Sequence, residues 1–186
     1  MKKHAPYLLL SAALLTIDLV SKDVVFRALN GYADDPYAWE TIEVIPRFFD
    51  LSVVRNPGAT FGLGAGMGPW LIVFNVVALI VIAVVAFRSD PARRIKTGSL
   101  FLILAGAIGN LYDRLAFGWV RDFLDFYVGD WWPWARDRLR DLRGAGGEHY
   151  WPFNIADACI VVGVITLAVI LWREDPARAR TPERAP

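Results

Sequence analysis

The stretch WLIVFNVVALIVIAVVAF, Trp70–Phe87, decides the class of this protein. It runs for eighteen residues without a charged side chain. Crossing the hydrocarbon core of a bilayer takes roughly 20 apolar residues, with about 17 as a lower limit. A buried core helix of a soluble protein is the alternative, but three further apolar stretches accompany this one. The pattern therefore favours a membrane protein.

The apolar stretches predict a single membrane domain with four spans. They cover residues 7–29, 70–87, 97–117 and 154–172. The N-terminus starts like a signal peptide but has no clear cleavage site, so an uncleaved first span is expected. Polar segments lie between the spans, and FFDLSVV, Phe48–Val54, is strand-like. The charged, proline-containing tail 173–186 is expected to be disordered.

The distribution of lysine and arginine predicts the orientation. Four spans place both chain ends on one side of the membrane. These ends and the linker 88–97 carry ten lysine and arginine residues, whereas the two long segments 30–69 and 118–153 carry seven over far more residues. Because positive loops stay in the cytoplasm, both termini are predicted to be cytoplasmic and the long segments outward. A cluster of arginines at 136–143 reduces the difference in positive charge between the two sides.

Overall composition excludes several classes of function. The net charge is only +1, which argues against nucleic-acid binding through a broad basic field. Cys159 is the only cysteine, so no internal disulfide can form. His4 and His149 are the only histidines, and His4 falls on the predicted cytoplasmic side. We therefore expect neither a metal nor another cofactor.

Polar side chains gather at the outward ends of three spans. An ionised group deep in lipid is costly, so such residues normally face a protein interior or a water-filled cavity. Their common membrane level predicts one shared polar site. The residues are Asp18 and Lys22 in span one, Asn110, Asp113 and Arg114 in span three, Asp122 just beyond it, and Asp157 in span four.

Each of these groups also has a structural interpretation, which the sequence leaves open. Asp157 stands where a helix dipole favours an acid. Asp122 could be a solvated loop acid, and Asp113–Arg114 a helix-end ion network. Asp18 and Lys22 lie four residues apart, a spacing that suits a structural ion pair.

Together, Asp122 and Asp157 would support amide hydrolysis. Two carboxylates that share a site do not ionise together easily, so one keeps a proton near neutral pH. The ionised acid can accept a proton from water while the other polarises a carbonyl. Asn56 and the backbone of 57–59 could bind an extended peptide, and Asn110 and Arg114 could orient a carboxylate or carbonyl.

A proton-coupled transporter or membrane assembly subunit is the alternative function. Intramembrane carboxylates also serve as proton relays. A relay needs polar groups through the full membrane depth, whereas span two offers only Asn75 and the cytoplasmic halves of spans three and four offer no charged or amide side chain. The sequence therefore favours an enzyme.

Four motifs resemble those of the lipoprotein signal peptidases (signal peptidase II). In family order, they are DLVSK (Asp18–Lys22), RNPGATFG (Arg55–Gly62), GNLYDRLAFGWVRDFLDF (Gly109–Phe126) and FNIADACI (Phe153–Ile160). The resemblance covers nearly the whole chain apart from the termini and one loop. It implies a bacterial inner-membrane aspartyl protease that acts on diacylglyceryl-modified prolipoproteins, on the N-terminal side of the lipidated cysteine. Such an enzyme would contact membrane lipids, and we expect a monomer.

The resemblance also assigns roles by motif. It implies that segment 30–69 is an outward, periplasmic β-rich cradle on an otherwise all-α membrane protein. The chain departs from the family pattern at Thr60, and in a long outward loop that sets the two acids 35 residues apart. Residues 134–147 are expected to form a charged surface helix over the site. The implied roles are catalytic for Asp122 and Asp157, substrate-binding for Asn56, Gly58, Ala59, Asn110, Arg114 and Asn154, and supporting for Asp18, Lys22 and Asp113.

Overall fold

The computed structural model describes residues 2–35, 37, 40–58, 68–129, 132, 134 and 149–174. Each predicted span overlaps one long helix and differs from it by a few residues at most. The helices are α1 (Ala5–Ala28), α2 (Gly68–Arg88), α3 (Arg94–Phe117) and α5 (Ile155–Arg173), and a short 3-10 helix, η1 (Lys2–His4), precedes α1.

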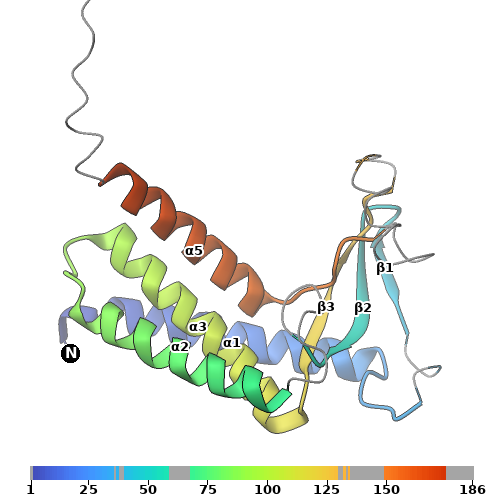
Figure 1. Ribbon diagram of the computed structural model, residues 1–186. Coiled ribbons are helices and arrows are strands. Elements are labelled where there is room, and N and C mark those ends of the chain that lie inside the picture. The colour runs from blue at the N-terminus through green and yellow to red at the C-terminus, as the bar shows by residue number, and fades with distance from the viewer. Residues whose placement is uncertain are drawn as a thin grey trace, which may run out of the picture.

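Helix α3 is the centre of the helical part. It packs against α1, α2 and α5, and more of its residues are buried than in any other described helix. The sheet lies at one end of the helices, and the N-terminus lies at the opposite end, where α5 also finishes (Figure 1). Polar residues at the sheet end of α1, α3 and α5 are thereby brought to the same level.

Three of the described helices are long and apolar enough to cross a membrane. They are Pro69–Arg88, Arg94–Phe117 and Ile155–Arg173. Helix α1, the predicted first span, is not among them, and its second half carries Asp18, Lys22, Asp23 and Arg27. The mostly helical, membrane-type architecture is confirmed, whereas the crossing by α1 stays a prediction.

Glycines let α5 approach α3 closely. A Cβ on Gly106 would collide with the backbone of Ala156, and one on Gly163 would meet the backbone of Ser99 and the side chain of Ile103. Small residues commonly permit such contacts between membrane helices. The first turn of α5 is therefore held directly against the middle of α3.

The three strands form one antiparallel sheet in the order β1-β2-β3. Strand β1 is Ile42–Ile45, β2 is Phe49–Asn56 and β3 is Val120–Phe126. The strand predicted at Phe48–Val54 is confirmed as β2. Its partner β3 corrects the expectation of a simple loop over 118–153, because pairing with β2 turns the start of that segment into a strand.

Strand β3 is placed by a turn and by its buried face. Gly118 ends α3 with a φ of 82°, a left-handed conformation that favours glycine and turns the chain into the strand. Phe123 packs in a buried apolar cluster with Phe26, Leu29 and Val53. Side chains alternate along a strand, so the neighbouring Asp122 faces the other way.

Three expectations from the sequence fall outside the described residues. They concern Ala59 as a substrate-binding residue, the surface helix expected at 134–147, of which only Trp134 is described, and all but the first two residues of the tail 173–186.

Candidate active site

Helix α5 begins with a reciprocal pair of hydrogen bonds between Asn154 and Asp157. The Asn154 side chain accepts from the Asp157 backbone N–H at 3.0 Å, and Asp157 Oδ2 accepts from the Asn154 N–H at 3.3 Å. This capping box satisfies backbone donors at the helix start. The structural interpretation of Asp157 is therefore confirmed, but it occupies only one carboxylate oxygen. The other oxygen, Oδ1, accepts from Asn110 Nδ2 at 2.7 Å.

Asp122 is buried on β3, with 1% of its surface exposed. Its Oδ2 accepts a hydrogen bond from Asn56 Nδ2 at 2.9 Å, and its Oδ1 accepts one from Asn154 Nδ2 at 2.6 Å. The interpretation of Asp122 as a solvated loop acid is wrong, because pairing with β2 carries the residue into the interior between sheet and helices.

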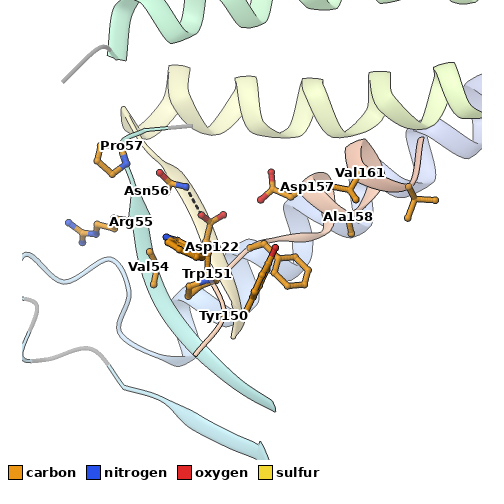
Figure 2. Close-up of a pocket in the computed structure, with 13 residues that line it drawn as sticks. Val54, Arg55, Asn56, Pro57, Asp122, Tyr150, Trp151, Asp157, Ala158 and Val161 are labelled. Atoms are coloured by element: carbon orange, nitrogen blue, oxygen red, sulfur yellow. Dashed lines mark hydrogen bonds between the residues drawn. The ribbon is translucent and has the colours of Figure 1, made fainter. Parts of the chain in front are cut away.

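Two asparagines connect the carboxylates. Asn154 Nδ2 donates to Asp122 and also, at 3.2 Å, to Asn110 Oδ1, while the Asn110 amide donates to Asp157. Figure 2 shows the carboxyl group of Asp157 pointing from α5 toward the side where Asp122 projects from β3. The acids thus belong to one hydrogen-bonded unit, although they lie 35 residues apart in sequence.

The surroundings of Asp122 favour its protonated form. Burial, and to a smaller extent the nearby carboxylate of Asp157, raise the pKa of Asp122 to about 7. Hydrogen bonds from Asn56 and Asn154 favour the ionised form and oppose this rise. Near neutral pH, Asp122 can therefore exchange a proton readily.

Lys22 lies at the base of this unit with its side chain fully buried. Its Nζ donates to Asp18 Oδ2 at 2.8 Å and to Asn110 Oδ1 at 3.2 Å, and lies 3.2 Å from Asp113 Oδ2. The predicted pair Asp18–Lys22 is confirmed. Asp18 also accepts from the backbone N–H of Ala156 at 2.8 Å, so this network ties α1 to α3 and α5.

The predicted ion network of Asp113 and Arg114 needs a correction. Asp113 is bound by Arg121 from β3, whose Nη2 lies 2.7 Å from Asp113 Oδ1. Arg114, the next residue of α3, points elsewhere and donates to the Gly58 carbonyl at 2.9 Å. The side chains of Asp113 and Arg114 point in different directions because adjacent residues of a helix do not share a face. Asp113 supports the core, and Arg114 holds the turn after β2.

The turn after β2 completes the polar shell. The Gly58 N–H donates to Asn56 Oδ1 at 3.0 Å, which orients the amide so that its nitrogen faces Asp122. Around the two acids, the structure thereby brings together all eight other described residues that were assigned a role from the sequence. Asp18 and Asp113 are joined to this shell through Lys22.

Sequence reasoning missed Arg121 and Tyr32. Arg121 is buried with Asp113, and its Nη1 donates to the Tyr32 hydroxyl at 2.8 Å. The alternation of VRDFLDF signals that Arg121 and Asp122 face opposite sides of a strand. No local signal identifies Tyr32, because its partner is far away in the sequence.

Two cavities meet at Asp157 and Asn56. The larger one has a volume of about 540 Å³, within the range of ligand sites, and its lining is mainly apolar. It is bordered by Asp122, by the segment Tyr150–Phe153 and by Ala158, Val161 and Val162 of α5 (Figure 2). The smaller one, about 170 Å³, lies between α2, α3 and α5. Asn56 and Asp157 line both.

The described residues contain no group of three or more histidine, cysteine, aspartate or glutamate side chains that could hold a metal ion. His149 is hydrogen-bonded to Asp125 at 3.1 Å, and Cys159 is buried in α5 as a free thiol.

Apolar membrane-type helices, a buried acid on β3 and a partly buried acid on α5 beside an apolar cavity together indicate a multi-pass membrane enzyme. The model of the family "Signal peptidase (SPase) II" matches residues 10–173, and the chain belongs to this family. It is 37% identical to a lipoprotein signal peptidase of Moorella thermoacetica, over 95% of this chain and 99% of that protein. It is 34% identical to one of Syntrophotalea carbinolica, over 90% and 91%. The family resemblance of the four motifs is confirmed.

Solved structures support the fold. A bacterial membrane enzyme determined at 2.3 Å resolution superposes with a TM-score of 0.72, covering 98% of this chain and 95% of the other at 22% identity. A second, determined at 1.9 Å resolution, gives a TM-score of 0.67 over 92% and 95% at 24% identity.

Proposed function

We propose that Asp122 and Asp157 are the catalytic pair of an aspartyl endopeptidase. The family removes signal peptides from prolipoproteins, and so does this chain. One observation carries the catalytic assignment: two carboxylates from distant parts of the chain share a hydrogen-bonded unit at the wall of an apolar cavity. The proposed substrate is diacylglyceryl-modified, and the bond cut lies on the N-terminal side of its lipidated cysteine.

The proposed reaction uses water and one shared proton. The ionised acid removes a proton from water, whose oxygen attacks the scissile carbonyl carbon, while the protonated acid donates to the carbonyl oxygen. As the C–N bond breaks, a proton returns to the leaving nitrogen. Asp122, with a pKa of about 7, can hold or release the proton. Because the acids interact, they titrate as a pair.

The surrounding residues keep the pair in this geometry. Asn56, Asn110 and Asn154 orient the carboxylates by direct hydrogen bonds. Arg114 fixes the Gly58 turn, where the proposal places the substrate backbone, with Ala59 beside it. Asp18, Lys22 and Asp113 support this unit from below.

The proposed setting is the bacterial inner membrane, crossed four times by a monomer. Helix α1 would be the remaining span. Its buried residues, Asp18, Lys22 and Phe26, face the protein, whereas Leu9, Ile17 and Val24 are more than half exposed and suit lipid contact. Both termini would be cytoplasmic, with the sheet on the outward side.

Separate Asp122→Asn and Asp157→Asn variants test the catalytic pair. Each removes a titratable group while keeping the shape of the side chain, so we expect turnover to fall at least about 100-fold. A gel shift with purified enzyme and a diacylglyceryl-modified prolipoprotein measures cleavage, and thermal unfolding in detergent checks the fold.

Asp50→Asn is the matched control for these variants. Asp50 lies opposite Asp125 on the same sheet but does not line the cavity, so its loss should leave turnover near wild type. Wild-type turnover by Asp122→Asn or Asp157→Asn would disprove the assignment of these two acids as the catalytic pair.

A further inference from the structure

Asn75 is a polar residue in an otherwise apolar helix. It is the only amide or hydroxyl side chain in Trp70–Phe87. It is partly buried and, with Leu71 and Ala78, lines the smaller cavity from the α2 side. The opposite wall of that cavity carries Asn110, Arg114 and Asp157. The carboxamide of Asn75 therefore borders the same space as the proposed catalytic unit.

No residue in the described part of the chain satisfies this carboxamide. It offers two donors and an acceptor, yet no hydrogen bond joins it to the described residues. The neighbouring polar groups are already engaged, since Asn110 donates to Asp157 and Arg114 donates to the Gly58 carbonyl. An unsatisfied amide in a membrane helix is costly because lipid supplies no partner. Its position at a cavity indicates that a ligand supplies one.

The arrangement of the two cavities indicates which part of a substrate would reach Asn75. The larger cavity offers the apolar side chains of Ala158, Val161 and Val162. Asp157 and Asn56 line both cavities, so a substrate that passes the acids from the larger cavity continues into the smaller one. There Asn75 is the polar side chain without a protein partner among the described residues.

We propose that Asn75 binds the substrate by donating a hydrogen bond to one of its carbonyl oxygens. This inference rests on the proposed function. A prolipoprotein bearing a diacylglyceryl group offers two such acceptors, the peptide carbonyls of the signal peptide and the ester carbonyls of the lipid. Both have the same hydrogen-bonding chemistry.

The variant Asn75→Leu tests the role, because leucine keeps the branched shape and the number of heavy atoms and removes all hydrogen bonding. Loss of one neutral hydrogen bond to bound substrate should raise KM roughly 3- to 10-fold and leave kcat nearly unchanged. The unfolding temperature should stay equal or rise, because an unsatisfied amide leaves the membrane helix. A residue with a structural role would instead lower the unfolding temperature when replaced.

A second substrate identifies the carbonyl. If Asn75 binds a lipid ester, the wild-type enzyme should show a higher KM for a dialkyl-ether substrate than for the ester substrate. The Asn75→Leu variant should then have the same KM as wild type for the ether substrate. If Asn75 binds a peptide carbonyl, the variant should raise KM by the same factor for ester and ether substrates. Either pattern supports the proposal and selects the source.

Val77→Leu, on the exposed side of α2, is the matched control and should behave as wild type. An unchanged KM in Asn75→Leu overturns the proposal, as does a lowered unfolding temperature together with lost turnover. These outcomes are distinct from failure of the proposed function. A fully active Asp122→Asn enzyme disproves the catalytic pair. If Asp122→Asn is inactive while Asn75→Leu has a normal KM, only the role of Asn75 is disproved.

Discussion

At the residue scale, the environment of Asp122 explains how an ordinary carboxyl can work at neutral pH. Burial raises its pKa to about 7, and the amides of Asn56 and Asn154 keep that value from rising further. The same two amides hold both carboxylate oxygens. The same two hydrogen bonds therefore fix the orientation of this acid and limit the rise in proton affinity that burial causes.

This environment predicts the pH dependence of cleavage. The proposed reaction needs one proton on the pair, so kcat/KM should fall as pH rises through about 7, where Asp122 loses its proton. In Asn56→Ala, the ionised carboxylate loses a hydrogen-bond donor, so its pKa should rise and the alkaline limb should move to higher pH. Rates measured from pH 5 to 9 provide the comparison.

Ser52→Ala, on the same strand as Asn56, serves as the control for that profile. The Ser52 hydroxyl is buried and has no hydrogen-bond partner among the described residues. Its removal should leave the alkaline limb in place. A limb that stays unmoved in Asn56→Ala, or moves to lower pH, would contradict the assigned effect of the Asn56 amide.

At the element scale, the contact between α3 and α5 sets the distance between parts of the site. Gly106 meets the backbone of Ala156 in the first turn of α5, directly beside Asp157. Asn110 lies one helical turn further along α3 and bonds to that acid. Any increase in the spacing of these two helices should therefore disturb the Asn110–Asp157 hydrogen bond.

Gly106→Ala should lower both stability and turnover. Its Cβ has no room beside backbone atoms, so α5 must shift, and overpacking of this kind typically costs about 1–3 kcal/mol. Thermal unfolding in detergent and the cleavage assay measure the two effects.

Gly98→Ala on the same helix is the control for Gly106→Ala. A Cβ there would meet only Tyr7, at 4.0 Å, so the better helix propensity of alanine should raise stability by up to about 1 kcal/mol. If both variants behaved alike, close packing at Gly106 would not control the spacing of the helices.

At the scale of the whole molecule, the arrangement separates two surfaces. The sheet lies at one end of the helices, and the N-terminus lies at the other (Figure 1). The polar unit belongs to the sheet end, because Asp122 is on β3 and Asp157 is in the first turn of α5. The linker between α2 and α3 is joined to the end of α5 by Glu174, which pairs with Arg93 and Lys96. The proposed topology places this basic end in the cytoplasm.

Single-cysteine labelling tests that topology in a Cys159→Ala background. A membrane-impermeant maleimide on spheroplasts should label Tyr37→Cys, which lies in a segment proposed to face outward, but should label Ala92→Cys only after permeabilisation. Lys3→Cys distinguishes three spans from four. It should behave like Ala92→Cys if α1 crosses the membrane, whereas labelling on intact spheroplasts would show that α1 does not cross.

The sequence by itself determined the apolar helices, the strand Phe48–Val54 and the pair Asp18–Lys22, and it selected Asp122 and Asp157 as the pair proposed to be catalytic. These features are readable because apolar length, residue spacing and short motifs are local properties of a chain. The sequence also placed Asp157 at the start of a helix, where the dipole favours an acid, and the structure adds the capping contact with Asn154.

Only the tertiary structure decided how those residues combine. It replaced Arg114 by Arg121 as the partner of Asp113, made a strand of 120–126, and linked the two acids through Asn154 and Asn110. It also raised the pKa of Asp122 to about 7. Each result depends on burial and on contacts between segments far apart in sequence, so the packing of α1, α3, α5 and the sheet had to supply it.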